Sequence, residues 1–510
     1  MWLAFTSTKR KKGPEPRTTS WQTIHAPSFS SLQPHTIFLS LSCTFYTYCY
    51  SRFAILAEIQ STSISKMPQP TILLVGTLDS KSPELHYTRR QIERLNACNV
   101  LILDVGRTQS NTSDTRTSNN NIINNNPSTS TPQILTPTTT TPLNTLPRAE
   151  YITTISHAAV RKATELYRAG HIHGIIGIGG SCGTNIATSV MREALPVGFP
   201  KLMVSTMASG DVRRFVEGTD ISMMYSVVDI AGTNTILNRI LRNAAAAISG
   251  MVAGSWANVD EEEDEETVQG KGAGKKNKVK VGITMFGVTT PCVDRVREYL
   301  ESAEQQQQSG YEVYVFHATG AGGKAMERLV KEKQLDAVID MTTTEVVDEL
   351  VGGVLSAGPS RLEAAAEAGI PQLVSVGACD MVNFGPREEL PTKFADRRIY
   401  EHNPTVTIVR TTVEENRRVA RWIADKLKRA KRPDRVRVLL PTGGVSLLDT
   451  PDQLFHDPAA DEMLFSTLET ELQGTGIAVV RDARAINEED FAVTAAQSFV
   501  QLIADTLQQA

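Results

Sequence analysis

From Thr71 onward, short apolar runs alternate with amphipathic segments of helical length, and glycine, serine or threonine often stands where an apolar run ends. This alternation is typical of βαβ units, because two parallel strands need a crossover, usually a helix, between them. With 41% hydrophobic and 21% charged residues in 510, the composition is that of a globular protein with a sizeable core. The sequence therefore predicts an α/β protein with mostly parallel, doubly wound sheets.

Each apolar run predicts a strand and each amphipathic segment predicts a helix. Thr412 with Glu415 three residues later forms a capping box, and Thr290 before Pro291 predicts an N-cap followed by a first helical residue. We expect strands at 71–75, 100–105, 174–178, 201–205, 279–285, 312–316, 337–340, 405–409, 436–440 and 477–480. We expect helices at 82–97, 152–169, 234–251, 293–304, 324–333, 361–368 and 413–429.

Three stretches lack this alternation and divide the chain. Residues 1–66 are rich in Ser, Thr, Lys and Arg, residues 108–147 are mostly Asn, Ser, Thr and Pro, and residues 259–278 join an acidic run to lysines. Such compositions bury too little apolar surface to form a core. We predict a disordered leader or mis-assigned start at 1–66, an N-terminal domain at 67–258 with a disordered insertion at 108–147, a charged linker at 259–278, and a C-terminal domain at 279–510.

The overall charge and the cysteines limit the partners and the cellular compartments that the sequence predicts. Lys and Arg number 52 against 56 Asp and Glu, a net charge of −4, which argues against DNA as a partner. Residues 38–59 are too polar to predict a membrane-spanning helix. The 6 cysteines show no CxxC spacing, so a reducing, intracellular setting is expected. The leader resembles a transit peptide, which would indicate mitochondria, whereas a start at Met67 indicates the cytoplasm, the compartment we favour.

Three loops of the N-terminal domain follow predicted strands and carry groups that suit phosphate. Residues 76–81 offer hydroxyls, a lysine and Asp79, which suits a ribose hydroxyl or a metal ion, while 177–184 and 206–211 offer glycines and hydroxyls. The second loop matches neither a Walker loop nor GxGxxG. Helix N-termini beyond the carboxyl ends of parallel strands attract anions, so these loops predict a phosphate or nucleotide site. The alternative is that the glycines serve tight strand–helix packing.

The second loop also contains GxSxG at 179–183 in a strand–turn–helix context, with Ser181 as the would-be nucleophile of a serine hydrolase. That alternative requires a histidine and an acid, and His317 and His402 lie further along the chain. Cys182 fits an activated thiol or a buried apolar residue.

The C-terminal domain repeats the design in three loops, at 286–291, 317–324 and 342–344, where helix capping explains the same residues equally well. Five further polar residues either belong to a functional site or satisfy buried backbone groups at turns. These residues are Asp380, Asn383, His402, Arg410 and Glu415. His171 and His173 form an HxH pair without an evident third metal ligand.

Eight short blocks in the same order, spread over residues 71–503, resemble an uncharacterised protein family that includes the tomato mosaic virus resistance protein, which binds ATP. One such block would not be specific, whereas the ordered set is. The blocks are residues 76–81, 179–184, 205–210, 226–230, 285–291, 380–385, 402–404 and 440–446.

The resemblance implies two Rossmann-like domains, ATP with or without Mg²⁺ on loops of the first domain, and a homodimer. It leaves open an unknown small substrate in the interdomain cleft, and it implies no particular reaction. Because residues 38–59 are polar, we expect no membrane partner. We therefore expect a nucleotide-binding protein, with the serine hydrolase and an ATP-stabilised dimer that binds a macromolecular partner as alternatives. The residues that the resemblance assigns to the nucleotide are Thr77, Asp79, Ser80, Lys81, Gly180, Ser181, Gly183, Thr184, Ser209 and Gly210.

Overall fold

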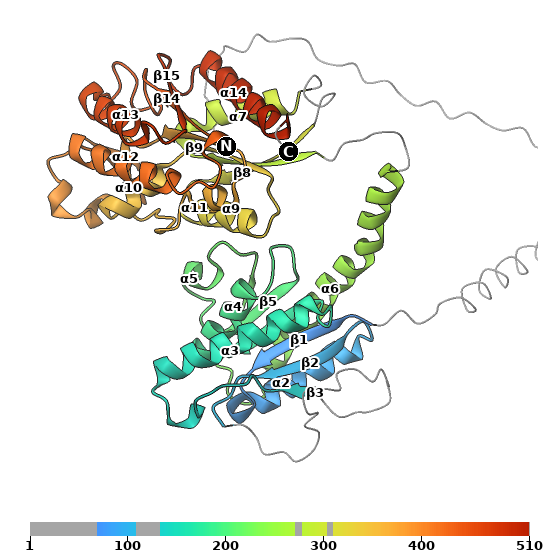
Figure 1. The fold of residues 1–510 in the computed structure, drawn as a ribbon. Coiled ribbons are helices and arrows are strands. Elements are labelled where there is room, and N and C mark those ends of the chain that lie inside the picture. The colour runs from blue at the N-terminus through green and yellow to red at the C-terminus, as the bar shows by residue number, and fades with distance from the viewer. Residues whose placement is uncertain (1–68, 109–132, 271–277, 303–309, 509–510) are drawn as a thin grey trace, which may run out of the picture. The chain divides into compact units, whose positions relative to one another are not determined.

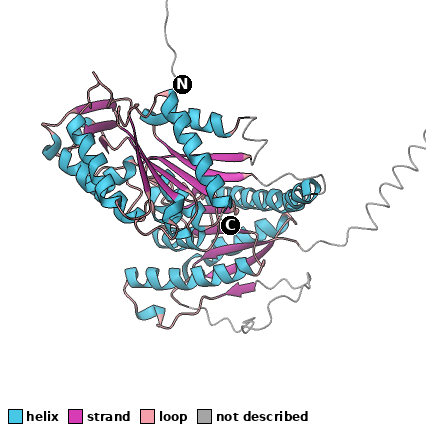
Figure 2. Cartoon of the chain, turned by 45° about the horizontal axis from the view of Figure 1, so that its top comes forward, coloured by secondary structure: helices cyan, strands magenta, loops and turns pink. Residues whose placement is uncertain are grey.

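The computed structural model of the protein describes residues 69–108, 133–270, 278–302 and 310–508 (Figure 1). The predicted leader at 1–66, with the stretch at 38–59, lies outside these ranges, as do residues 109–132 of the predicted insertion. Within the described ranges, the framework consists of two six-stranded parallel sheets, one in the first half of the chain and one in the second. Figure 2 shows helices on both sides of the strands.

The N-terminal sheet has the strand order β3-β2-β1-β4-β5-β6, and each neighbouring pair is parallel. Because successive side chains of a strand point to opposite faces, Leu73 packs with α3 and α4 while Leu74 packs with α2 and α6. The strands are β1 (Thr71–Gly76), β2 (Asn99–Asp104), β3 (Gln133–Leu135), β4 (Gly174–Gly179), β5 (Lys201–Ser205) and β6 (Ser222–Tyr225). The helices are α2 (Leu78–Arg94), α3 (Arg148–Arg168), α4 (Ser181–Glu193), α5 (Arg213–Val216) and α6 (Thr235–Gly270).

The C-terminal sheet has the order β15-β14-β10-β9-β7-β8, again parallel throughout. One face packs against α10, α12 and α13, and the other against α7 and α14. The strands are β7 (Val279–Met285), β8 (Tyr311–His317), β9 (Ala337–Thr342), β10 (Gln372–Gly377), β14 (Val436–Pro441) and β15 (Ala478–Asp482). The helices are α7 (Thr290–Leu300), α9 (Ala321–Lys331), α10 (Thr344–Val351), α11 (Glu363–Ala368), α12 (Val413–Leu427), α13 (Pro458–Leu472) and α14 (Glu489–Gln508).

A small antiparallel sheet with the order β11-β13-β12 is added to the C-terminal half. It consists of β11 (Met381–Phe384), β12 (Ile399–Asn403) and β13 (Val406–Arg410). All four residues of β11 are buried, including Asn383, so this sheet forms part of the core. The sequence pattern predicted one of its strands, at 405–409, which β13 confirms. It did not predict β11 and β12, because these strands are short and mix apolar with polar residues.

The predicted fold class, two Rossmann-like α/β domains with mostly parallel sheets, is confirmed by the two sheets and their covering helices. The capping box is also confirmed, since the Thr412 side chain accepts from the Glu415 N–H and Glu415 accepts from the Thr412 N–H. The predicted N-cap at Thr290 is wrong by one residue, because α7 begins at Thr290 and Thr289 is its N-cap.

Regular structure extends into two segments that we expected to be irregular. Residues 133–135 of the expected insertion form β3, which pairs with the open edge of β2. Helix α6 continues to Gly270, through most of the expected linker at 259–278. Residues 259–270 contain no proline and many glutamates, which favour helix intrinsically. Local composition did not reveal the available sheet edge that stabilises β3.

A buried arginine organises the region between β9, α9 and α10. Arg361 is 1% exposed, and its guanidinium lies 2.6 Å from Asp340, 2.9 Å from Glu345 and 3.3 Å from Glu327. These carboxylates come from three different elements, so the arginine offsets the cost of burying all of them.

We expect Arg361→Leu to lower the free energy of unfolding by about 3–5 kcal/mol, because it leaves buried carboxylates without a counter-charge. Urea unfolding at neutral pH measures this loss. Arg429→Leu is the matched control: Arg429 also pairs with a carboxylate, Glu363 at 3.0 Å, but its side chain is 58% exposed, so a loss below about 1 kcal/mol is expected. Equal losses in the two variants would contradict the role given to Arg361.

Candidate functional site

The predicted site loops meet at one edge of the N-terminal sheet. The chain runs from β1 outward to β2 and β3, then returns to β4 on the other side of β1. The point between β1 and β4 is therefore the topological switch point, where open α/β sheets bind ligands. The loop with Thr77 and Lys81 follows β1, the loop with Gly180 and Ser181 follows β4, and the loop with Ser209 follows the neighbouring β5.

The glycines of the second loop have different roles. A Cβ on Gly179 would lie 2.8 Å from the Cα of Gly183, so Gly179 permits close packing of α4 on β4. A Cβ on Gly180 would meet only the Thr206 hydroxyl, at 3.6 Å, and one on Gly183 only the Ile178 carbonyl, at 3.5 Å. Packing therefore explains Gly179 but leaves Gly180 and Gly183 unexplained.

The hydroxyl groups of the predicted site divide into inward and outward ones. Thr184 is fully buried, and its hydroxyl bonds to the Gly180 carbonyl at 2.8 Å and to the Ser205 hydroxyl at 2.6 Å. It fixes the start of α4 against β5 rather than facing a ligand. Thr77 and Ser80 bond to each other at 2.7 Å, while Ser181 lies exposed at the first position of α4.

The two charged residues of the first loop hold neighbouring backbone. Asp79 accepts hydrogen bonds from the N–H groups of Arg107, at 2.8 Å, and Thr108, at 3.2 Å. The ammonium of Lys81 donates to the carbonyl of Ile230, in the segment that follows β6. Since an ammonium has three N–H donors, this bond leaves donors for an anion. Ser209 and Gly210 are exposed in the third loop.

The start of α4 is the distinctive feature of this edge. Its N-cap is Gly180, and the first-turn N–H groups of Ser181, Cys182 and Gly183 meet no side-chain acceptor in the described part of the chain. Helix starts of this kind carry unpaired N–H donors and a partial positive charge, so they favour anions.

Three other helices that begin near strand ends, α2, α7 and α9, are capped by side chains from elsewhere in the chain. The Asp104 carboxylate accepts from the N–H of Leu78 in α2, at 2.9 Å. The Asn487 side chain accepts from Cys292 in α7, at 3.3 Å, and Glu345 accepts from Gly320 and Gly323 around the start of α9, at 2.7 and 3.0 Å. In these places an internal oxygen occupies the position that an external anion would take.

The contacts of Glu345 explain the glycine-rich loop at 317–324. The sequence allowed two interpretations of this loop, ligand binding and helix capping. A Cβ on Gly323 would lie 2.1 Å from the Glu345 carboxylate, and one on Gly322 would lie 1.9 Å from the His317 carbonyl. These glycines make room for the protein's own carboxylate and backbone. The capping interpretation fits this loop.

Two arginines that the sequence analysis did not select lie beside the start of α4. Arg148, the first residue of α3, donates from Nε to the Cys182 sulfur at 2.9 Å. Arg107 stacks on the ring of Tyr151, 4.5 Å from its centroid. Burial, with Asp79 and Cys182 as neighbouring groups, raises the pKa of Tyr151. Arg107 and Arg148 flank the insertion, so their proximity is invisible in the sequence.

Asp104 at the end of β2 is a third residue that the sequence pattern did not indicate. Dinucleotide-binding folds place an acidic residue near this position to bind ribose. Here the side chain is 2% exposed, one carboxylate oxygen accepts from the backbone of both Leu78 and Gly106, and burial raises its pKa. Asp104 is thus a structural cap, and the arrangement does not suit NAD-type recognition.

The geometry gives the serine-hydrolase alternative no support. No hydrogen bond joins the Ser181 hydroxyl to a histidine or a carboxylate among the described residues. A nucleophile elbow places its serine in a strained turn, but Ser181 begins a regular helix and is not among the described residues with positive φ.

The polar candidates of the C-terminal half likewise divide into buried structural residues and an exposed one. Arg410 and Asp380 are fully or almost fully buried in a charged cluster with Asp449 and Asp461, which the sequence analysis did not select. Asn383 is buried against Asp348, and Glu415 serves the capping box and pairs with Arg397. His402 is exposed on β12. No signal in the sequence links Asp449 and Asp461 to Arg410, because they meet only in the folded chain.

The HxH pair has a structural explanation. His173 accepts a hydrogen bond from the Thr71 N–H at 2.9 Å and packs edge-on against Trp256. In the described ranges, no three His, Cys, Asp or Glu side chains are grouped as a metal site requires. No described helix has both the length and the apolar character needed to cross a membrane.

With two doubly wound domains and an anion-favouring switch point, the chain is of the class of Rossmann-like two-domain proteins. Residues 70–257 match the N-terminal domain, and residues 278–503 the C-terminal domain, of the Uncharacterised protein family (UPF0261). The chain belongs to this family.

Relatives are found in bacteria and plants. A UPF0261 protein of Clostridium tetani is 48% identical over 332 residues, which cover 65% of this chain and 76% of that protein. The ToMV resistance protein Tm-1(GCR237) of Solanum lycopersicum is 43% identical over 333 residues, covering 65% of this chain but only 42% of the tomato protein. The resemblance to a family that includes a tomato mosaic virus resistance protein is confirmed.

A UDP-N-acetylglucosamine 2-epimerase from Rickettsia bellii is similar in structure to 87% of this chain and 98% of its own, with 8% identity and a TM-score of 0.20. A likeness this low carries no argument about function.

Gly179→Ala and Gly180→Ala are expected to differ sharply, although the two positions are adjacent. The first places a methyl 2.8 Å from the Gly183 backbone and should lower the free energy of unfolding by about 1–3 kcal/mol through overpacking. The second meets only a hydroxyl at 3.6 Å and should change it by less than about 0.5 kcal/mol. Chemical unfolding of both variants measures this, and similar losses would mean that Gly180 is also a packing residue.

Proposed function

We propose that the N-terminal domain binds a nucleotide, with its phosphate groups at the start of α4 and ATP as the ligand. The observation that carries this proposal is the uncapped first turn of α4 at the switch point, in a protein that caps α2, α7 and α9 with its own side chains. Three N–H groups pointing to one place favour an anion, and phosphate is the anion that such turns commonly bind.

The charges around this turn support a phosphate ligand over a carboxylate. Arg148 lies against Cys182 in the first turn of α4, and Arg107 lies over Tyr151, which borders the same turn. Lys81 adds an ammonium on the adjacent loop. Cations contributed by α3, by the segment after β2 and by the loop after β1 suit a ligand with more than one negative group.

The structure changes the roles expected of individual residues. Gly180, Ser181 and Gly183 are the direct phosphate contacts in this proposal, through backbone N–H groups and the exposed Ser181 hydroxyl. Asp79 and Thr184 act indirectly, because their side chains already hold the backbone of the neighbouring loops. A Mg²⁺ ion would reach the protein mainly through the phosphates, as is usual for nucleotide sites.

ATP is favoured over NAD because Asp104 is committed to capping α2, and because the family resemblance includes an ATP-binding protein. ATP consumption stays a prediction, and so does the alternative in which ATP only stabilises a homodimer that binds a macromolecular partner. The small substrate and the cytoplasmic setting also stay predictions. Neither the turn nor the cations favour one of these alternatives.

Titration of the full chain with ATP, with and without Mg²⁺, should raise its thermal unfolding midpoint. Ligand at a hundredfold excess over its Kd adds about 2.7 kcal/mol of stability. Arg148→Ala should weaken the ATP affinity about tenfold or more, since a hydrogen bond to a charged group contributes roughly 1.5–3 kcal/mol.

Arg161→Ala provides the matched control, because Arg161 is an exposed arginine of the same helix, α3. It should bind ATP like the wild type. A wild-type midpoint that does not move with ATP, ADP or inorganic triphosphate would reject the proposal, and equal effects of the two variants would remove Arg148 from the site.

A further inference from the structure

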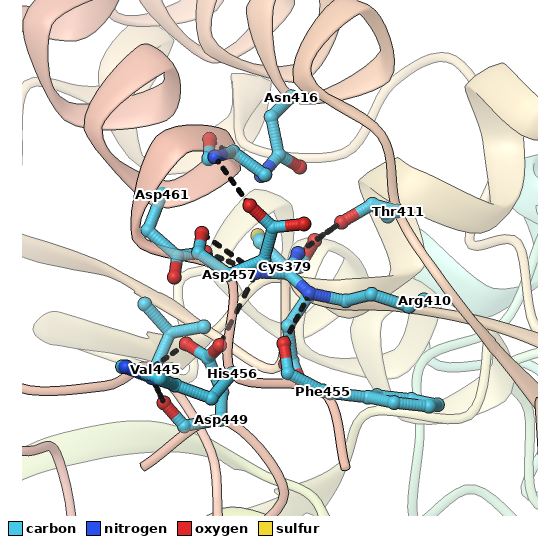
Figure 3. Close-up of polar contacts among 12 residues, drawn as sticks. Cys379, Arg410, Thr411, Asn416, Val445, Asp449, Phe455, His456, Asp457 and Asp461 are labelled. Atoms are coloured by element: carbon cyan, nitrogen blue, oxygen red, sulfur yellow. Dashed lines mark hydrogen bonds and ion pairs between the residues drawn. The ribbon is translucent and has the colours of Figure 1, made fainter. Parts of the chain in front are cut away.

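The C-terminal domain contains a buried charge cluster that the proposed nucleotide site does not use (Figure 3). It consists of Arg410 at the end of β13, Asp449 in the loop after β14, Asp461 in the first turn of α13, and Asp380 between β10 and β11. The side chains of Arg410, Asp449 and Asp461 are only 3%, 0% and 9% exposed. These groups therefore interact with almost no screening by water.

Two carboxyl groups converge on one nitrogen of the arginine. Nη2 of Arg410 lies 3.2 Å from Oδ1 of Asp449 and 2.5 Å from Oδ1 of Asp461. The two carboxyl groups therefore lie side by side on the same guanidinium nitrogen. Two ionised carboxylates brought together in this way repel each other, whereas one proton held between the pair removes that repulsion.

The charge count of the cluster also requires protons. Asp380, Asp449 and Asp461 would carry three negative charges when ionised, against the single positive charge of Arg410. Asp380 makes no ion pair with that arginine: one oxygen accepts from the Ser446 hydroxyl at 2.8 Å and the other has no partner among the described residues. Burying unpaired charge costs several kcal/mol per ion, so protonation is the cheaper state.

We propose that Asp449 and Asp461 share one resident proton beside Arg410, and that this proton holds the start of α13 and the loop after β14 against the three-stranded sheet. The proton thereby joins three segments that are far apart in the sequence. Its loss at alkaline pH leaves two carboxylates on one guanidinium nitrogen and loosens this contact.

The other groups around the cluster cannot replace the proton. Arg410 donates to the Phe455 carbonyl at 2.6 Å and to the Thr411 hydroxyl at 2.7 Å, and the Val445 N–H donates to Asp449 at 3.0 Å. These contacts are neutral. The charged or titratable groups nearby are His456, Asp457, Arg398 and Cys379. A ring nitrogen of His456 contacts the Asp449 carbonyl, and Cys379 bonds with Thr343. Asp457 caps α13 and lies 3.8 Å from Arg398.

The direction of the pKa shifts agrees with this geometry. Burial, with Asp449 as an added negative neighbour, raises the pKa of Asp461 to about 8, and burial raises the pKa of Asp449 as well. Burial and the Asp449 charge raise the pKa of Asp380 to about 7. Since the pair is coupled, the proton belongs to both carboxyl groups together.

The sign of the pH effect follows from linkage. Between the unfolded carboxyl pKa, near 4, and about 8, the folded protein binds more protons than the unfolded chain, so this contribution to stability is full below that window and lost as the pH rises through it. Asp461→Asn removes it, because an amide carries no negative charge at any pH and still accepts from Arg410.

The test compares the full-length wild type with Asp461→Asn and with Glu462→Gln. Glu462 is the next residue of α13 but is exposed and pairs with Arg481 at the surface. Infrared spectra record the carbonyl stretch of protonated carboxyl groups, and urea unfolding records stability, each from about pH 6 to about pH 9.5, a range in which exposed carboxylates are ionised.

Wild type and Glu462→Gln should show a protonated-carboxyl band near pH 6 that disappears towards pH 9. Asp461→Asn should lose the part of this band that comes from Asp449 and Asp461. The urea midpoint of Asp461→Asn should rise relative to the wild type as the pH increases. If Asp461→Asn does not fold, Asp449→Asn replaces it in the same infrared and urea measurements, with the same expected results. A wild-type spectrum without the band near pH 6, or a band unchanged in both amide variants, overturns the proposal.

Discussion

Every helix that follows a strand in these sheets begins with N–H groups that have no partner within the helix, and this requirement shapes both domains. At several of these helices the protein answers it with its own buried side chains, as Glu345 does at the start of α9 in the C-terminal domain. In the N-terminal domain Asp104 does the same for α2, but α4 begins with Gly180 and no cap. The position with the open donors is also the topological switch point of the sheet.

Internal caps bring buried charge into the core, and buried charge requires further charge. Glu345, Asp340 and Glu327 pair with three different nitrogens of Arg361, so one arginine joins several elements together. Around Arg410 the compensation is weaker, because Asp449 and Asp461 meet on the same nitrogen and Asp380 makes no ion pair with this arginine. A proton is the smallest group that supplies the missing compensation, and it makes the cluster sensitive to pH.

The sequence allowed more of the fold to be predicted than of the site. The alternation of apolar and amphipathic segments predicted the two parallel sheets, and the positions of the loops after β1, β4 and β5 predicted that these loops share one edge. It did not predict that Thr184 turns inward to Ser205, nor that Asp79 holds the backbone of Arg107. Glycine and hydroxyl patterns look alike whether they bind a ligand or satisfy the chain itself.

By itself, the sequence determined the class of the fold, the order of its elements and the family, because hydrophobic periodicity and short ordered motifs are local properties of the chain. Only the tertiary structure decided which helix start stays open, and which arginines lie beside it. Arg107 and Arg148, like Arg410 and Asp461, come together through strand order and helix packing. Charge pairing in a folded protein depends on distances through space and on burial, and neither is encoded in the spacing of residues along the chain.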